Sequence, residues 1–202
     1  RRGSLMVDAF AGVGGDAIQH ALCNPCGLVV AIELDEARIS MARHNAKKYG
    51  VLRRLDFVIG DFTALAPRLR ADSVCLSPPW GGIGGDEDHR AEKPSFDLSR
   101  LRPCSGVQLI RLAQACAPSI AFHLPRHTDA AQIEQLASAH SSGECEVQEV
   151  VRMRKKKGKK TEQLVVYFRG PLGLAKSQKS RRLADRVFAA EPFQLTHGGA
   201  DT

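Results

Sequence analysis

The sequence predicts an α/β fold, with a mostly parallel sheet of seven strands that ends in an antiparallel hairpin. Short β-rich runs alternate with segments of helical periodicity as far as residue 140, the pattern of strands joined by crossover helices. Two further β-rich runs flank a basic connector around residue 158, which is typical of a hairpin at a sheet edge. With 202 residues, 43% hydrophobic and 25% charged, the chain fits one globular domain rather than a disordered or fibrous protein.

The first part of the chain is expected to contribute four strands. These are predicted at 5–10, 28–33, 55–59 and 72–76. The helix after the first strand spans 15–22, and its apolar side carries Ala17, Ile18, Ala21 and Leu22. The next helix begins after an N-cap at Asp35, and its apolar stripe is Ile39, Ala42, Ala46 and Tyr49.

The second part continues the alternation and then changes to a hairpin. A helix is expected at 105–116, opened by a capping box between Ser105 and Gln108. A strand at 119–124 and a helix from about 129 to 140 follow. The hairpin strands are predicted at 144–153 and 163–168, with Gly158 in the turn that joins them.

Two further segments are expected to be irregular. The glycine-rich and acidic segment 81–94 is long for a loop, which favours a functional role. Residues 171–202 lack sustained patterning, so we expect a domain of residues 1–170 followed by a flexible tail.

The positive charge of the chain is concentrated in one segment. Lys and Arg number 29 against 22 Asp and Glu, and seven basic residues lie in the run 152–160 (RMRKKKGKK). Such a run can contact phosphates, act as a nuclear address, or form a solvated hairpin tip. No apolar run approaches the roughly 20 residues of a membrane-spanning helix, so we expect no membrane partner.

The cysteines give no sign of a metal site. Of the six, only Cys23 and Cys26 are closely spaced. A zinc site of the usual kind needs four ligands in recognisable pairs, and the sequence offers no second pair. We therefore expect reduced, structural cysteines in an intracellular protein, and no bound metal.

A glycine turn follows the first strand, in the segment 7–16 (VDAFAGVGGD). Its glycines let the backbone approach a ligand closely, and Glu33 at the end of the next strand suits the two hydroxyls of a ribose. The spacing of Gly12 and Gly14 also fits a dinucleotide site. However, Asp8 would repel a pyrophosphate, so it favours a cationic or zwitterionic cofactor such as S-adenosylmethionine.

An acidic and an aromatic residue follow the third strand. Asp61 suits the amino group of adenine, and Phe62 places an apolar ring beside it. The alternative for Asp61 is a helix N-cap at the surface.

The fourth strand runs into Ser77-Pro78-Pro79-Trp80, followed by two glycines. Two successive prolines cannot continue a central strand, and they fix a rigid extended turn whose carbonyls point in set directions. An amino group on an aromatic ring can donate to these carbonyls and to Ser77, while Trp80 offers a flat face for stacking. Such a turn indicates a methyltransferase of exocyclic nucleobase nitrogens, although a Trp is more often a core residue.

Together, these motifs resemble the trimethylguanosine synthase family of RNA cap guanosine-N2 methyltransferases. The similar segments occur in order between Val7 and Phe168: VDAFAGVGGDAIQHAL, VVAIELD, ARHNAKKYG, FVIGDF, ADSVCLSPPWGG, FDL and HLPRHTD. The resemblance implies a Rossmann-like class I methyltransferase fold, with residues 1–170 as the catalytic domain and S-adenosylmethionine as cofactor. It implies methylation of the exocyclic N2 of N7-methylguanosine RNA caps, giving di- or trimethylguanosine caps.

The resemblance also implies roles by position. Trp80 would stack on the methylated guanine, and Ser77 with Pro78 would lie near the attacking nitrogen, so these three are the expected catalytic residues. Arg126, in the turn after the fifth strand, would approach the cap phosphates. The cofactor contacts it implies are Asp8, Phe10, Gly12, Gly14, Glu33 and Asp61.

Guanine methylated at N7 suits this site for a physical reason. The base carries a positive charge, so stacking on the Trp80 indole gains a cation–π contribution of about 0.5–2 kcal/mol. In-line attack of N2 on a sulfonium methyl needs alignment more than a strong base, so no catalytic triad or metal is expected.

Partners and location follow from the same resemblance. It implies capped RNA as substrate, in particular small nuclear and small nucleolar RNA, and a monomeric enzyme in the nucleus, with the cytoplasm as a second location. The chain departs from the family pattern at Ile83 and His127 and in the basic run 152–160, where we expect contact with the RNA backbone or a nuclear signal. The family also places a helical extension before the first strand, whereas six residues precede Val7. We therefore expect a chain of this extent to bind the cap weakly and to have little activity.

Three other functions stay open on the sequence. One is methylation of another exocyclic amine, such as guanine N2 in rRNA or tRNA or adenine N6 in DNA. The others are a non-catalytic RNA- or cap-binding module and a nicotinamide dehydrogenase. Methylation of a free N7-methylated cap tests the first, S-adenosylhomocysteine binding the second, and dinucleotide binding the third.

Overall fold

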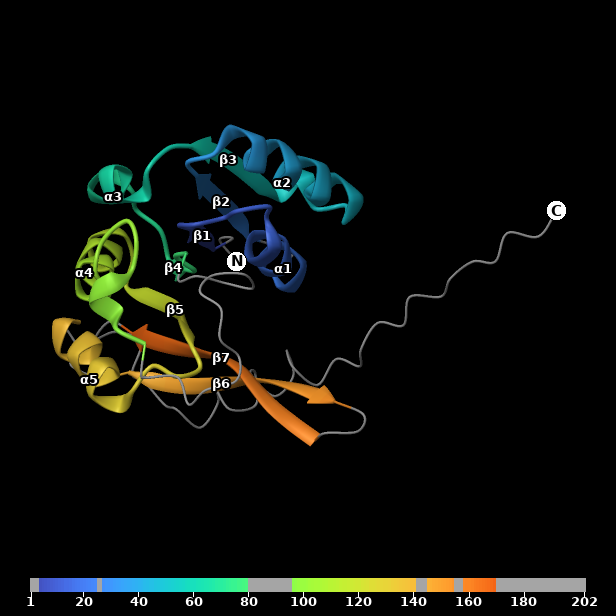
Figure 1. Ribbon diagram of the computed structural model, residues 1–202. Helices are drawn as coiled ribbons and strands as arrows, with labels where there is room; N and C mark the ends of the chain where they lie inside the picture. The colour runs from blue at the N-terminus through green and yellow to red at the C-terminus, as the bar shows by residue number, and fades with distance from the viewer. Residues whose placement is uncertain (1–3, 25–26, 80–95, 141–144, 155–157, 170–202) are drawn as a thin grey trace.

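The predicted α/β fold is confirmed by the computed structural model, which describes residues 4–24, 27–79, 96–140, 145–154 and 158–169. The described strands form one sheet in the order β3-β2-β1-β4-β5-β7-β6 (Figure 1). The first five pair in parallel, and β7 is antiparallel to both β5 and β6. The strands are β1 (Leu5–Asp8), β2 (Leu28–Glu33), β3 (Leu55–Ile59), β4 (Ser73–Leu76), β5 (Ser119–Pro125), β6 (Glu146–Arg154) and β7 (Gly158–Arg169).

Helices cover the sheet from both sides (Figure 1). On one side lie α1 (Gly15–Cys23) and α2 (Glu36–Lys48), and on the other α3 (Phe62–Leu65), α4 (Gly106–Cys116) and α5 (Ala130–Ala139). Each side buries its own apolar cluster. The larger one contains Phe62, Phe122 and Phe168, and the smaller one packs α1 against β2. The sheet is thus held between two cores, as alternating strands and helices require.

The helices begin where the sequence signals predict. Asp35 caps α2 by accepting a hydrogen bond from the backbone N–H of Ala37 at 2.8 Å. At α4, Ser105 Oγ accepts from the backbone N–H of Gln108 at 3.4 Å, and Gln108 Oε1 accepts from that of Ser105 at 3.2 Å. The predicted capping box is therefore confirmed, and it satisfies N–H groups that have no partner within the helix.

The hairpin differs from the prediction. β6 extends to Arg154 and β7 begins at Gly158, so most of the basic run belongs to these two strands. Gly158 pairs with Arg154 instead of occupying the turn. Ladder hydrogen bonds come from the backbone, so charged side chains do not prevent pairing at the end of a two-stranded ribbon. Residues 155–157 and the side chains of 151–162 lie outside the described part of the chain.

Three smaller details of the prediction are wrong. β1 ends at Asp8 rather than at residue 10, because the ladder register slips there by one residue: the N–H of Phe10 donates to Oδ1 of Asp8, and the N–H of Ala11 donates to the carbonyl of Ile32 at 2.9 Å. Leu22 and Tyr49 do not belong to the buried helix faces, since they are 41% and 59% exposed. Tyr49 is the residue after the last turn of α2, where the helical periodicity no longer applies.

The strand order reverses between β1 and β4, which are neighbours in the sheet although β2 and β3 intervene in the sequence. The helices α1 and α4, which come after these two strands in the chain, lie on opposite sides of the sheet (Figure 1), and at such a reversal of strand order ligand sites lie at the carboxyl ends of the strands. The fold therefore places a ligand site at this edge. None of the helices in the described residues is long and apolar enough to cross a membrane.

Candidate active site

A cavity of about 430 Å³ lies at the carboxyl ends of the first four strands. A cavity of this size suits a nucleoside-sized ligand. The predicted site residues that line it are Phe10, Gly12, Glu33, Asp61, Phe62 and Ser77. The structure thus brings together six predicted residues from four separate strand ends.

The glycine turn forms one wall of this cavity. Gly12 and Gly14 have φ angles of +53° and +89°, a backbone conformation that favours glycine. A Cβ on Gly12 would meet nothing within 4 Å, so this position faces open space. A Cβ on Gly14 would lie 3.1 Å from the Cβ of Ala42, so Gly14 lets the turn pack closely on α2 and does not line the cavity.

Glu33 fixes this turn in place. Its Oε2 accepts a hydrogen bond from the N–H of Gly12 at 2.9 Å, and its Oε1 accepts from the N–H groups of Leu34 and Asp35 at 2.9 and 3.1 Å. The side chain is only 10% exposed, and Arg38 approaches Oε1 to 3.9 Å. Each carboxylate oxygen has two lone pairs, and Oε1 already accepts two hydrogen bonds, so Oε2 keeps the capacity to accept from one ligand hydroxyl.

Asp61 and Phe62 follow β3 and form another part of the wall. Asp61 caps α3, and Thr63 donates to its Oδ1 from both the backbone N–H and the hydroxyl, each at 2.8 Å. Within the described residues, Oδ2 accepts no hydrogen bond. The ring of Phe62 meets that of Phe10 edge to face, with centroids 5.9 Å apart. Asp61 is therefore both a helix cap and a cavity residue.

Asp8 lies behind the wall rather than in it. It is fully buried, and its Oδ1 accepts from the N–H of Phe10 at 3.4 Å. Its Oδ2 is buried with no hydrogen-bond partner among the described residues. Burial, reinforced by the neighbouring carboxylate of Asp16, raises the pKa of Asp8 to about 7. An unpartnered buried oxygen of this kind favours a positively charged group nearby.

The turn after β4 places Ser77 at the border of the cavity. Its hydroxyl donates to Oδ2 of Asp16 at 2.6 Å. Pro78 is buried, whereas Pro79 is exposed and lines the cavity. Trp80 and the segment 81–94 lie outside the described residues, so the predicted stacking role of Trp80 stays a prediction.

Arg126 lies apart from this group. It is exposed in the turn between β5 and α5, where the carbonyl of Pro125 accepts hydrogen bonds from the N–H and the hydroxyl of Thr128. It does not line the cavity. An exposed Arg in a fixed turn can meet a phosphate outside the cofactor site, and this role also stays a prediction.

Several residues that line the cavity were not predicted as part of the site, among them Leu34, Arg38, Arg102 and Pro103. Leu34 and Arg38 follow Glu33 directly, and their nearness to the end of β2 could have indicated them. Arg102 and Pro103 come from the segment before α4, which no motif marked. Two arginines thus add positive charge beside the carboxylates of the cavity.

Comparisons with known proteins agree with this geometry. Residues 3–171 match the family described as RNA cap guanine-N2 methyltransferase. Over 143 residues, the chain is 34% identical to the trimethylguanosine synthase of Schizosaccharomyces pombe. This match covers 68% of the chain and 56% of that protein, so the chain spans little more than half the length of this curated relative.

Solved structures support the fold. A methyltransferase of Agrobacterium tumefaciens, described as dependent on S-adenosylmethionine, superposes with a TM-score of 0.63 at 11% identity, covering 83% of this chain and 56% of that one. A precorrin-6Y C5,15-methyltransferase of Geobacter metallireducens gives a TM-score of 0.54 at 14% identity, covering 84% and 81%. At such low identity these likenesses show a shared architecture and leave the substrate open.

Proposed function

The chain belongs to the RNA cap guanine-N2 methyltransferase family, and from this premise we propose that it methylates the exocyclic N2 of N7-methylguanosine caps of RNA, with S-adenosylmethionine as methyl donor. The observation that carries this proposal is the cavity where the glycine turn, Glu33 and Asp61 meet the Ser77 turn. Cofactor-binding and acceptor-binding motifs border the same space there, as methyl transfer between two bound molecules requires.

The residues of the cavity suit this cofactor. Oε2 of Glu33 has capacity for one ribose hydroxyl, and Oδ2 of Asp61 is available to the amino group of adenine. Phe62 and Phe10 give an apolar surface for the purine ring. The buried carboxyl of Asp8 adds negative potential behind the glycine turn, which favours the cationic methionine portion over a pyrophosphate.

S-adenosylmethionine supplies an electrophilic methyl group on a sulfonium sulfur. The part of the protein is to hold the acceptor nitrogen in line with that methyl group and to exclude water. Ser77 and the carbonyls of the Pro78-Pro79 turn would accept hydrogen bonds from the exocyclic amine, so that its lone pair points at the methyl group. The amine becomes acidic as it is alkylated, so its proton can pass to solvent without a strong base.

The proposal extends to the substrate and the location. Trp80 would select the positively charged N7-methylated guanine by stacking, and Arg126 would contact the cap phosphates. We expect small nuclear and small nucleolar RNA as substrates, a monomeric enzyme, and a nuclear location, with one or two methyl groups added to each cap.

Methyl transfer to cap dinucleotides tests this function. The chain is incubated with S-adenosylmethionine and either an N7-methylated or an unmethylated cap dinucleotide, and the products are analysed by mass spectrometry. We expect one or two added methyl groups on the N7-methylated cap only. Methylation of both caps, or only of guanine in rRNA or tRNA fragments, would favour another exocyclic amine as substrate and overturn the cap proposal.

Two variants make the test specific. Trp80→Ala is expected to abolish the preference for the N7-methylated cap, whereas Trp80→Phe keeps part of it because a smaller aromatic face remains. Calorimetry with S-adenosylhomocysteine separates a binding module from an enzyme: a chain that binds the cap but not this product has no methyltransferase function.

A further inference from the structure

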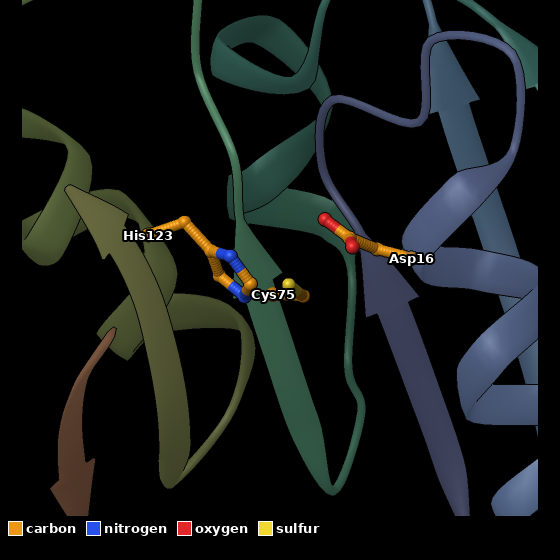
Figure 2. A group of neighbouring side chains, drawn as sticks. All are labelled: Asp16, Cys75 and His123. Atoms are coloured by element: carbon orange, nitrogen blue, oxygen red, sulfur yellow. The ribbon is translucent and has the colours of Figure 1, made fainter. Parts of the chain in front are cut away.

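Three side chains from different elements converge beside the cofactor cavity without lining it. They are Asp16 of α1, Cys75 of β4 and His123 of β5 (Figure 2). One oxygen, one sulfur and one nitrogen atom, one from each residue, lie within 4.8 Å of one another. Carboxylate, thiol and imidazole together form a donor set for a metal ion rather than for an organic ligand.

The fold places these residues together for simple reasons. Cys75 pairs with Ala121 in the parallel register of β4 and β5. His123 is two residues farther along β5 than Ala121, so its side chain lies on the same face of the sheet as that of Cys75. Asp16 lies in the first turn of α1, and one of its carboxylate oxygens lies within 4.8 Å of the sulfur of Cys75 and of a ring nitrogen of His123 (Figure 2). The cluster thus forms where the side chain of Asp16, at the start of α1, reaches the neighbouring strands β4 and β5.

We propose that Asp16, Cys75 and His123 bind one Zn²⁺ ion, with a water molecule in the fourth position. A tetrahedral Zn²⁺ holds oxygen, nitrogen and sulfur ligands at about 2.0–2.3 Å, which puts the ligand atoms within about 4 Å of one another. The three atoms, which lie within 4.8 Å of one another, would therefore move closer together on binding. On binding, the thiol of Cys75 releases its proton to solvent and the sulfur binds as thiolate.

The surroundings of the cluster support a cation. In the part of the chain that the structure describes, the hydroxyl of Ser77 donates to Asp16 at 2.6 Å, and no Lys or Arg forms an ion pair with this carboxylate. The side-chain amide of Gln163 lies beside His123, with its nitrogen 3.3 Å from Nδ1. An amide nitrogen only donates, so for Nε2 of His123 to bind the ion this amide would turn over and accept from Nδ1–H through its oxygen. A partner that accepts from the ring N–H in this way commonly orients the histidine of a metal site.

A second cavity lies along the strands that carry Cys75 and His123, although none of the three proposed ligands lines it. It measures about 290 Å³ and is lined by His20, Ser73 and Ala121, among others. His20 follows Asp16 by one helical turn, while Ser73 and Ala121 precede Cys75 and His123 by two residues on their strands. The second cavity therefore continues the face on which the cluster lies.

The site is separate from the proposed cofactor site but linked to it by one residue. Ser77 lines the cofactor cavity, donates to Asp16, and has its hydroxyl oxygen 3.7 Å from the sulfur of Cys75. An ion bound to Asp16 would hold this hydroxyl in position. Its role would thus be to support the acceptor side of the site, not to take part in methyl transfer.

Metal binding to the full chain tests the proposal directly. The purified protein is stripped with a chelator and dialysed against Zn²⁺ or Co²⁺, and bound metal is measured by mass spectrometry. We expect about one equivalent of either ion, and for Co²⁺ the near-ultraviolet band of a thiolate ligand with the strong visible bands of tetrahedral coordination. Binding well below one equivalent, or a Co²⁺ spectrum without the thiolate band, would overturn the proposal.

Variants assign the ligands. Cys75→Ser is expected to remove the thiolate band, and His123→Gln to weaken Zn²⁺ binding about tenfold or more. Cys116→Ser, which changes a buried cysteine of α4, is the matched control and should keep both the thiolate band and the affinity for Zn²⁺. Loss of the metal in Cys23→Ser with retention in Cys75→Ser would place the ion at the Cys23 and Cys26 pair and contradict the proposal.

Separate controls show whether each variant folds and whether metal binding is independent of methyl transfer. Circular dichroism of each stripped variant shows whether it folds, and the Co²⁺ spectrum of the unchanged protein needs no variant. These measurements use neither cofactor nor RNA. A failure of the metal proposal therefore leaves the proposed methyl transfer untouched, and the reverse also holds.

Discussion

Oε2 of Glu33 accepts a hydrogen bond from the backbone N–H of Gly12 at 2.9 Å, across 21 residues of sequence. This contact joins the glycine turn after β1 to the end of β2. The other oxygen of Glu33 accepts from the two backbone N–H groups that follow it, so one carboxylate organises two walls of the cavity. In the proposed function, the residue that meets the ribose thus also holds the turn that meets the rest of the cofactor.

Glu33→Gln tests this double role. The amide keeps one acceptor oxygen and replaces the other by a donor, which faces an N–H group at one of the two positions. We expect S-adenosylhomocysteine to bind about tenfold or more weakly, and the free energy of unfolding to fall by about 1–3 kcal/mol. Calorimetry and urea unfolding measure the two effects. Glu36→Gln, an exposed change in the first turn of α2, should leave both values unchanged.

The two roles can be told apart. If Glu33→Gln weakens ligand binding without any loss of stability, the residue contacts the ligand but does not organise the turn. An unchanged affinity would contradict the assignment of this cavity to the cofactor.

Gly14→Ala is expected to destabilise the protein. The φ of +89° is unfavourable for alanine, and the new Cβ would lie 3.1 Å from the Cβ of Ala42 in α2. Together these costs amount to about 1–3 kcal/mol, measured by urea unfolding. Gly15→Ala is the matched control, because a Cβ there meets nothing within 4 Å and begins a helix that alanine favours. Equal stability of the two variants would show that the turn does not depend on close packing against α2.

Much of the fold and of the cofactor cavity could be predicted because the signals are local. Glu33 and Asp61 each follow a β-rich run directly, and parallel strands bring such ends to one edge of the sheet. Arg102 could not be predicted, because its place depends on how the segment before α4 folds back over the cavity.

The contact between Asp16 and Ser77 could not be predicted either, because it depends on the fold and not on a local signal. Asp16 and Ser77 are 61 residues apart, and neither one marks the other in the sequence. The three side chains of the proposed metal site likewise come from three separate elements, without the paired spacing by which zinc sites are usually recognised. Contacts of this kind depend on sheet order and register, which the sequence pattern left open.

Ser77→Ala should separate catalysis from cofactor binding. The hydroxyl borders the acceptor side of the cavity and donates to Asp16, so its loss removes a contact that aligns the amine. We expect kcat for cap methylation to fall about tenfold to a hundredfold, with little change in the affinity for S-adenosylhomocysteine. Steady-state kinetics and calorimetry measure these quantities. If the variant loses only affinity for the cofactor, Ser77 contacts the cofactor rather than the acceptor amine, which contradicts the role proposed here.

The buried carboxyl of Asp8 predicts a pH dependence that can be assigned to one residue. Its pKa rises from 3.8 to about 7 in the folded protein, so between these values the native state binds more protons than the unfolded state. The contribution of Asp8 to stability is therefore complete below about pH 4, declines as the pH rises, and is lost above about pH 7. Thermal unfolding with chelator present, so that no metal competes, should show the melting temperature of the unliganded protein falling by several degrees across this range.

Asp8→Asn isolates this effect, because the amide is uncharged at every pH. The variant should lack this part of the decline and should exceed the unchanged protein in melting temperature at about pH 8, where the buried carboxylate is charged and has no partner for Oδ2 among the described residues. A cationic cofactor favours the charged carboxylate, so S-adenosylmethionine should bind the unchanged protein more tightly as the pH rises through about 7, and the variant should not show this gain. If the two proteins share the same pH dependence in both measurements, Asp8 does not titrate in this range and the negative potential behind the glycine turn has another source.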